Sequence, residues 1–192
     1  MKSSFCSRTI VILFLGIIFS ALQLSQASGL TDNFESKHFH ISYQEGVDPL
    51  GVAHQIKIDA YSVDGSKDNS YSGNTPEEIL GNNIENLFDE VSDTLDMHLY
   101  SYKGNIRIYR NREELKKVLF DRFGRHVDYP AIYHEQGNTI YMSAEGLRVG
   151  ILAHEMAHAI IDHYFVVKPP MRIQEVLAGF VEYTITKKLK KK

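Results

Sequence analysis

Alternating apolar and polar residues mark two segments in the first third of the chain as candidate β-strands. Residues 33–43 place aromatic and aliphatic side chains on one face, and residues 54–62 repeat this pattern. The two segments can therefore pair with each other in a sheet. Residues 63–74, which follow, are polar and rich in Gly, Ser, Asn and Asp, which is typical of a loop.

A helix is predicted immediately after this loop. Thr75 can cap its first turn, Pro76 fits the first helical position, and Glu78 can return a hydrogen bond to the capped end. The apolar residues beyond this start recur at helical spacing, so they form one stripe along the helix. We expect that stripe to be buried; it consists of Ile79, Leu80, Ile84, Leu87, Phe88, Val91 and Leu95.

Shorter elements are predicted in the middle of the chain. Residues 104–110 have the pattern of a short strand, and a helix is expected to begin at Asn111. Residues 131–133 and 138–142 then predict a hairpin or two edge strands, with residues 135–137 between them.

Two helices are predicted to complete the chain, at about residues 147–164 and 171–187. Pro169 and Pro170 separate them, because proline ends one helix and suits the first turn of the next. The lysines of residues 187–192 are favourable at a helix C-terminus and in a solvated tail, which we prefer to a membrane-binding role.

The first 27 residues have the features of an export signal. Lys2 and Arg8 precede the uncharged apolar run Ile10–Leu22, and small residues then lead to a cleavage site after Ala27. The alternative is an uncleaved membrane anchor, but the run is shorter than the roughly 20 apolar residues of a spanning helix. We therefore predict a signal peptide at residues 1–27 and a periplasmic or secreted protein.

Composition narrows the class of partner. The chain has 192 residues, of which 43% are hydrophobic and 23% are charged, as expected for one globular domain. Its formal net charge of −3 argues against nucleic acid as a partner, since phosphate binding needs a basic surface. The single cysteine, Cys6, lies in the predicted signal, so the mature chain is expected to form no disulfide. We expect no stable membrane insertion after signal cleavage.

The candidate chemistry lies in the stretch from Gly150 to Asp162, which contains the pattern His-Glu-x-x-His. His154 and His158 are four residues apart, so on a helix both imidazoles share one face and can share one zinc ion. Glu155 can reach a water on the ion without being a ligand. Zinc lowers the pKa of such a water to about 7, and the glutamate can take its proton. The alternative is an amphipathic helix with surface histidines.

A third zinc ligand must come from a neighbouring element. Glu175 follows His158 by seventeen residues, beyond the proline pair, and a helix hairpin of that length can bring it back to the histidines. Glu182, two turns further on the same face, is either an alternative ligand or a carboxylate that orients a ligand histidine. Asp162 can orient a histidine in the same way, or it is a solvated charge at the helix end.

Two segments resemble the gluzincin metallopeptidases, the group that includes thermolysin. They are His154–Ile161 (HEMAHAII) and Gln174–Tyr183 (QEVLAGFVEY), and the family pattern is HExxHA followed by a segment like EGLAEY. Within the group the chain is most similar to small peptidase MA-like domains. Weaker similarity lies upstream, where residues 34–43 resemble the opening strand of the family and residues 138–141 the strand before the metal-binding helix.

The resemblance implies a Zn²⁺ ion held by His154, His158 and Glu175, with Glu155 as the general base. It also implies that an edge strand, here residues 138–142, lines the cleft and pairs with an extended peptide.

The predicted architecture follows from this resemblance together with the element pattern. We expect residues 28–192 to form a single zincin-like α+β domain. It should contain a mixed, mostly antiparallel sheet and a helical metal-binding half.

The chain departs from the family around the third ligand. The family often has tryptophan shortly before the ligand glutamate, whereas Arg172 and Ile173 occupy that region here. Val176 stands where glycine is usual, and Gly179 stands where a second acidic residue is often found. A peptidase also needs a donor for the developing oxyanion, and the candidates are Tyr133, His134, Arg172 and Tyr183.

The sequence thus predicts an exported zinc metallopeptidase acting on peptide or protein substrates. The first alternative is a catalytically inactive binding protein on a zincin scaffold with a structural zinc. The second is an exported helical domain without a metal.

Overall fold

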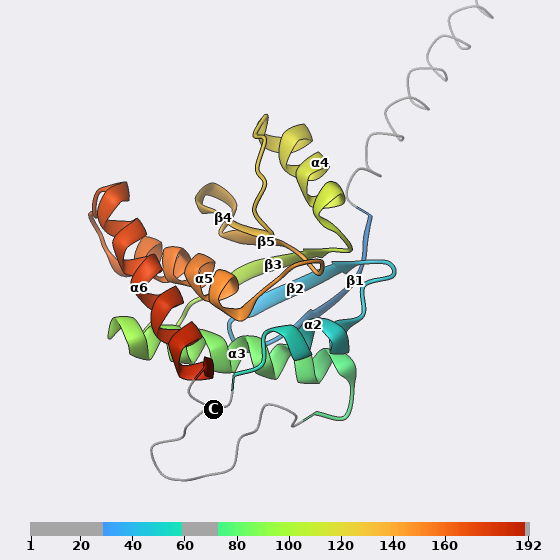
Figure 1. The fold of residues 1–192 in the computed structure, drawn as a ribbon, viewed down its shortest axis with the longest axis horizontal. Coiled ribbons are helices and arrows are strands. Elements are labelled where there is room, and N and C mark those ends of the chain that lie inside the picture. Colours follow the sequence, from blue (N-terminus) through green and yellow to red (C-terminus); the bar gives the residue numbers. More distant parts are fainter. Residues whose placement is uncertain (1–28, 59–72, 191–192) are drawn as a thin grey trace, which may run out of the picture.

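The computed structural model describes residues 29–58 and 73–190, which form one mixed sheet packed against helices (Figure 1). The predicted signal peptide, residues 59–62 of the second predicted strand and most of the 63–74 loop lie outside these ranges. The α+β class, the mixed sheet and the helical C-terminal half are confirmed.

The sheet has five strands in the order β1-β2-β3-β5-β4. Its outer pairs, β1 with β2 and β4 with β5, are antiparallel, whereas β2 and β5 both run parallel to β3. The strands are β1 (Leu30–Glu35), β2 (Phe39–Gln44), β3 (Gly104–Tyr109), β4 (Ala131–His134) and β5 (Thr139–Ser143).

The order of the strands corrects the predicted edge. Residues 138–142 were expected to form the edge strand, but β5 lies between β3 and β4. The free edge on this side belongs to β4, because the hairpin folds it outward from β5. A hairpin can lie on the sheet in either order, and only its tertiary pairing decides which strand becomes the edge.

The first predicted strand is two strands joined by a tight turn. The amide of Ser36 donates to the carbonyl of Phe39 at 2.8 Å, which reverses the chain and makes β1 and β2 a hairpin. Glu85 stabilises the turn from outside the hairpin, since its carboxylate accepts from the backbone amide of His38 at 2.7 Å. The continuous alternation across residues 33–43 concealed this turn.

Part of the second predicted strand is helical instead. Residues 54 and 55 end α2 (Pro49–Gln55), which begins where Asp48 accepts a hydrogen bond from the amide of Leu50 at 3.0 Å. Asp48 followed by Pro49 is a helix start signal, so the cap and proline override the alternation that follows them.

The predicted helix starts after residue 74 are confirmed. The Thr75 hydroxyl accepts from the amide of Glu78 at the start of α3 (Pro76–Leu95), and the Glu78 carboxylate accepts from the amide of Asn74. Asn111 caps α4 (Arg112–Phe123) in the same way.

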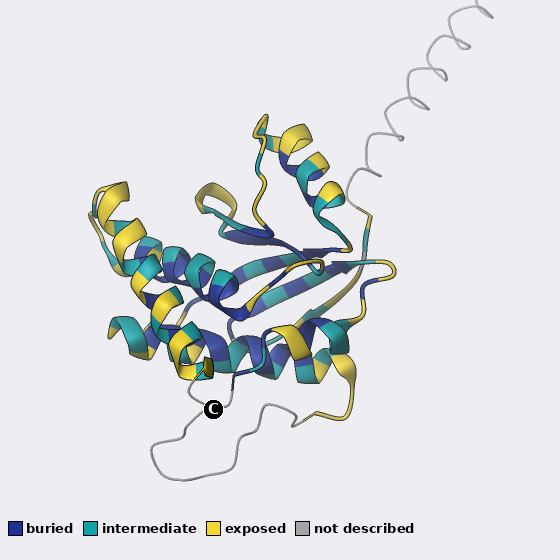
Figure 2. Cartoon of the chain, in the orientation of Figure 1, coloured by how far each residue is buried: buried dark blue, intermediate teal, exposed yellow. Residues whose placement is uncertain are grey.

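The two faces of the sheet have separate cores. Figure 1 shows α4 apart from the other helices, and Figure 2 shows buried residues along the strands between them. Ile106 and Ile108 of β3 point into the larger core, which also contains residues of α2, α3 and the C-terminal helices α5 (Val149–Tyr164) and α6 (Met171–Lys190). Tyr109 and Tyr141 point into the smaller core beneath α4. In the part of the chain that the structure describes, no helix has the length and apolarity needed to cross a bilayer.

Candidate metal centre

The candidate centre is built on the hairpin of α5 and α6. Gly150 allows the two helices to approach closely, because a Cβ atom at this position would lie 2.5 Å from the Thr186 hydroxyl oxygen. Pro170 begins the return, and its carbonyl accepts from the amides of Ile173 and Gln174 just inside α6. The predicted break at the proline pair is therefore confirmed, and it brings α6 alongside the histidine face of α5.

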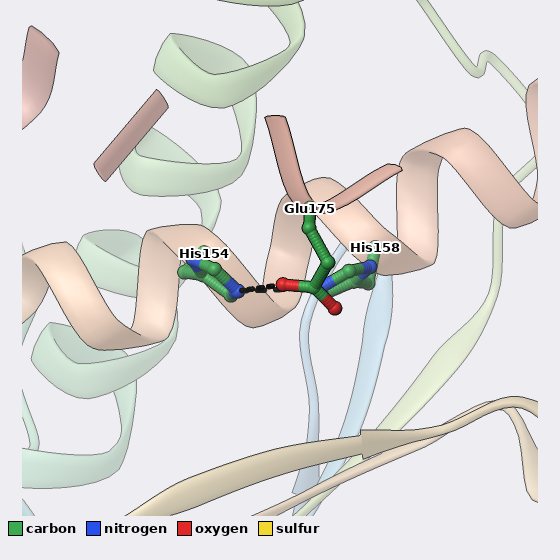
Figure 3. Close-up of side chains that lie close together, drawn as sticks. All are labelled: His154, His158 and Glu175. Carbon is green, nitrogen blue, oxygen red and sulfur yellow. Dashed lines mark hydrogen bonds and ion pairs between the residues drawn. The ribbon is translucent and has the colours of Figure 1, made fainter. Parts of the chain in front are cut away.

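The structure brings His154, His158 and Glu175 together, as the sequence predicted. Figure 3 shows the Glu175 carboxylate from α6 reaching toward the two imidazoles on α5. The two Nε2 atoms are 3.2 Å apart; that of His154 lies 3.5 Å from Oε2 of Glu175, and that of His158 lies 3.5 Å from Oε1. The imidazole side chains are 22% and 13% exposed and that of Glu175 is 53% exposed, so the cluster sits at the wall of an accessible cleft.

These separations fit the ligand shell of zinc. Ligand atoms about 2.0–2.1 Å from one tetrahedral ion lie roughly 3.4 Å from each other. The two Nε2 atoms are close to this separation, each lies 3.5 Å from a different oxygen of Glu175, and one ligand atom from each residue can be chosen so that all three lie within 4.8 Å of one another. Two imidazoles and one carboxylate are also ligand types that zinc accepts. Burial and the neighbouring His154 lower the pKa of His158, which favours the neutral imidazole that a metal requires.

Glu155 faces the same cleft from α5. Its Oε2 accepts a hydrogen bond from the backbone amide of Tyr133 at 2.7 Å, which ties it to the edge strand β4. Burial raises the pKa of Glu155 to about 7, and the charges of Glu175 and Glu182 add to this effect. A carboxyl group with such a pKa can both accept and release a proton near neutral pH.

The second ring nitrogen of His154 and the side chain of His158 also have partners on α6. Nδ1 of His154 lies 3.3 Å from Oε2 of Glu182, within ion-pairing distance although not aligned for a hydrogen bond. The side chain of Gln174, whose Nε2 donates to the Pro169 carbonyl at 2.9 Å, lies beside His158 and raises its pKa, opposing burial. Glu182 thus faces the second nitrogen of His154, whereas Glu175 belongs to the group that could hold a metal ion. Gln174 was not predicted, and only its adjacency to Glu175 could have indicated it.

Asp162 has neither of its predicted roles. Its side chain is 10% exposed, so it is not a solvated charge at the helix end. Instead it accepts a hydrogen bond from the Tyr133 hydroxyl at 3.0 Å and forms an ion pair with Lys168. Asp162 therefore joins β4 to the end of α5 and the loop that follows.

A cleft of about 730 Å³ contains the cluster. Its lining comes from four regions: the segment between α4 and β4, β4 with the residues just after it, the histidine face of α5 with the residue before that helix, and the inner face of α6. The edge strand β4 thus borders the cleft in place of residues 138–142, and the backbone amide of Tyr133 on that edge points toward Glu155.

The candidate oxyanion donors differ in whether they line the cleft. Tyr133 and His134 line the cleft, but the Tyr133 hydroxyl is engaged by Asp162 and the His134 ring stacks on Phe123. Tyr183 and Arg172 are not among the residues that line the cleft. Three lining residues that the sequence did not single out could donate hydrogen bonds there: Arg125, Tyr129 and Arg148.

The cluster therefore combines three potential ligands, a general base candidate and an accessible cleft in a single domain. Comparison of the chain with family models, curated proteins and solved structures finds no match.

Proposed function

We propose that the protein is a zinc-dependent metallopeptidase whose ion is held by His154, His158 and Glu175. The observation that carries the proposal is that one ligand atom from each of the three residues lies within 4.8 Å of the other two, with the Glu155 carboxylate facing the same cleft. A zinc ion held there would lower the pKa of a bound water and polarise a carbonyl group.

The residues of the chain supply the proton transfers. Glu155 accepts the proton of the attacking water and then passes it to the leaving amine. Its raised pKa suits both steps, because the carboxyl group changes protonation state near neutral pH. The amide of Tyr133 holds the Glu155 carboxylate at a defined position in the cleft.

The substrate would be an extended peptide or protein segment. The edge of β4 borders the cleft and pairs with no strand that the structure describes, and an extended peptide can add to such an edge through backbone groups other than the Tyr133 amide, which bonds to Glu155. This arrangement would place a peptide bond beside the ligand cluster. It assigns to β4 the role that the family resemblance gave to residues 138–142.

A binding protein with a structural zinc is the second candidate. The placement of the expected oxyanion donors favours it. The Tyr133 hydroxyl bonds to Asp162, and Arg172 and Tyr183 are not among the cleft-lining residues. The two functions differ in turnover and not in metal binding, so they can be separated experimentally.

The test is digestion of a broad peptide library by the purified full chain, with and without a chelator. We expect zinc-dependent cleavage that Glu155→Gln abolishes, while the variant keeps its zinc because it retains all three ligands. Bound zinc without cleavage of any peptide would reject the peptidase in favour of the binding protein. Cleavage by Glu155→Gln at the native rate would reject the assigned general base.

A further inference from the structure

The outward face of α6 carries four exposed apolar side chains at helical spacing. Figure 2 shows this helix as largely exposed along its outer side, whereas Ala178, Val181 and Ile185 on its other face are buried. We call the exposed residues the α6 stripe; they are Ile173 (48% exposed), Val176 (63%), Phe180 (53%) and Tyr183 (62%).

The stripe is larger than an isolated exposed side chain. Val166 and Val167 are also exposed, in the turn between α5 and α6. Contiguous exposed apolar surface on a folded domain marks an interaction site, since leaving it in water is unfavourable.

The charges on this side of α6 are all positive. At about 100° per residue, Arg172, Lys187 and Lys190 fall on the same arc of the helix as the stripe. Lys187 lies over the Tyr183 ring, 5.3 Å from its centroid. The two acidic residues of α6, Glu175 and Glu182, both face the histidines of α5 instead.

We propose that the α6 stripe docks the protein peripherally on an anionic lipid surface. Aromatic and aliphatic side chains flanked by Lys and Arg are typical of helices that lie in the plane of a membrane interface. Tyrosine suits the level of the lipid headgroups, and the basic side chains can extend to the phosphates. The docking is independent of the proposed peptidase activity and requires no spanning helix. It replaces the solvated role that the sequence alone favoured for Lys187 and Lys190, because the structure places exposed apolar side chains beside them.

Charge complementarity favours lipid over a second copy of the chain. If two stripes packed antiparallel about Val176 and Phe180, Arg172 of each copy would approach Lys187 of the other. Like charges at such a contact are unfavourable, whereas an anionic surface attracts all of them.

Tryptophan fluorescence can test the proposal directly, because the chain contains no tryptophan. Phe180→Trp introduces a single reporter on the stripe, and Phe120→Trp is its matched control on α4, at a phenylalanine of similar exposure. The full chain of each variant is titrated with vesicles of phosphatidylcholine alone or mixed with phosphatidylglycerol. Any binding through the apolar run Ile10–Leu22 is common to both variants.

Docking predicts that the emission of the Phe180→Trp variant shifts to shorter wavelength with anionic vesicles and is quenched by brominated lipid chains. Both effects should be lost as salt rises, because salt screens the attraction between the basic side chains and the lipid. The control should show neither effect. Adding Lys187→Gln and Lys190→Gln to the reporter variant should lower its apparent partitioning on the order of 20-fold at low salt.

Three results would overturn the proposal. The first is an emission spectrum of the Phe180→Trp variant that no vesicle changes. The second is an equal shift in the Phe120→Trp control, which would mean that the stripe has no special part in binding. The third is a shift that depends on protein concentration without vesicles, which would make the stripe a contact between copies of the chain.

Discussion

The two helices that supply the candidate ligands are held in the fold very differently. Nine of the 16 residues of α5 are buried, whereas only three of the 20 residues of α6 are. The histidines therefore project from a helix that the core fixes on several sides, while Glu175 projects from a helix packed along one face. The histidine pair is preorganised by the core, and completion of the site depends on how α6 packs against α5.

Replacing Glu175, the candidate ligand on α6, should have the largest effect on zinc affinity and little effect on the stability of the metal-free fold. Glu175→Ala is expected to lower zinc affinity by more than about 100-fold, the upper end of effects for residues that only orient a ligand. Its side chain is 53% exposed, so the free energy of unfolding without metal should change by less than about 0.5 kcal/mol. Zinc titration and urea unfolding with chelator measure the two quantities. Unchanged zinc affinity would exclude Glu175 as a ligand.

Substitutions at two glycines test whether stability and zinc binding depend on how closely α6 packs against α5. Gly150→Ala should destabilise the protein by about 1–3 kcal/mol and weaken zinc binding, because its Cβ atom would collide with Thr186 and displace α6. Gly179→Ala is the matched control, since a Cβ atom there meets nothing within 4 Å. It should stabilise the helix by about 0.5–1 kcal/mol. Equal effects of the two substitutions in thermal unfolding would argue against close helix packing at Gly150.

Glu182 should affect metal binding less than Glu175 does. Glu182→Gln removes the charge that faces Nδ1 of His154, and zinc affinity should fall by about 10- to 100-fold. Competition with a chromophoric chelator measures the change. A loss as large as that of Glu175→Ala would instead make Glu182 a ligand.

Glu155, on the buried helix α5, should make the stability of the metal-free protein depend on pH. Burial raises its folded pKa from 4.5 to about 7, so its contribution is fully present below pH 4.5 and is lost as the pH rises through 7. The shift corresponds to roughly 3 kcal/mol, of which we expect about 1–2 kcal/mol because the carboxylate is partly accessible from the cleft. Urea unfolding with chelator at pH 5 and pH 8 measures the difference, which Glu155→Gln should remove. If wild type and variant have the same pH dependence, the pKa of Glu155 is not raised.

Local signals explain what the sequence could predict. The capping of α3 by Thr75, the proline break before α6 and the shared face of His154 and His158 all depend on residues close in the chain. The position of Glu175 was also within reach, because a short helix hairpin leaves few ways for α6 to return. These features follow from residue spacing and backbone preference, so they can be predicted without knowledge of the tertiary structure.

The features that the sequence did not reveal depend on contacts between distant segments. The turn between β1 and β2 is held by Glu85 of α3, and the partners of Asp162 come from β4 and from Lys168. The choice of β4 as the edge strand is likewise set by the pairing of β5 with β3. Alternation and helical spacing describe one segment at a time, so they carry no information about these pairings.

Calorimetric titration of the metal-free full chain with Zn²⁺ tests the central claim most directly, with His158→Ala as the comparison. We predict one zinc ion per chain for the wild type and no comparable binding for the variant. A wild-type protein that binds no zinc, or a variant that binds it equally well, would contradict the assignment of His154, His158 and Glu175 as a metal centre.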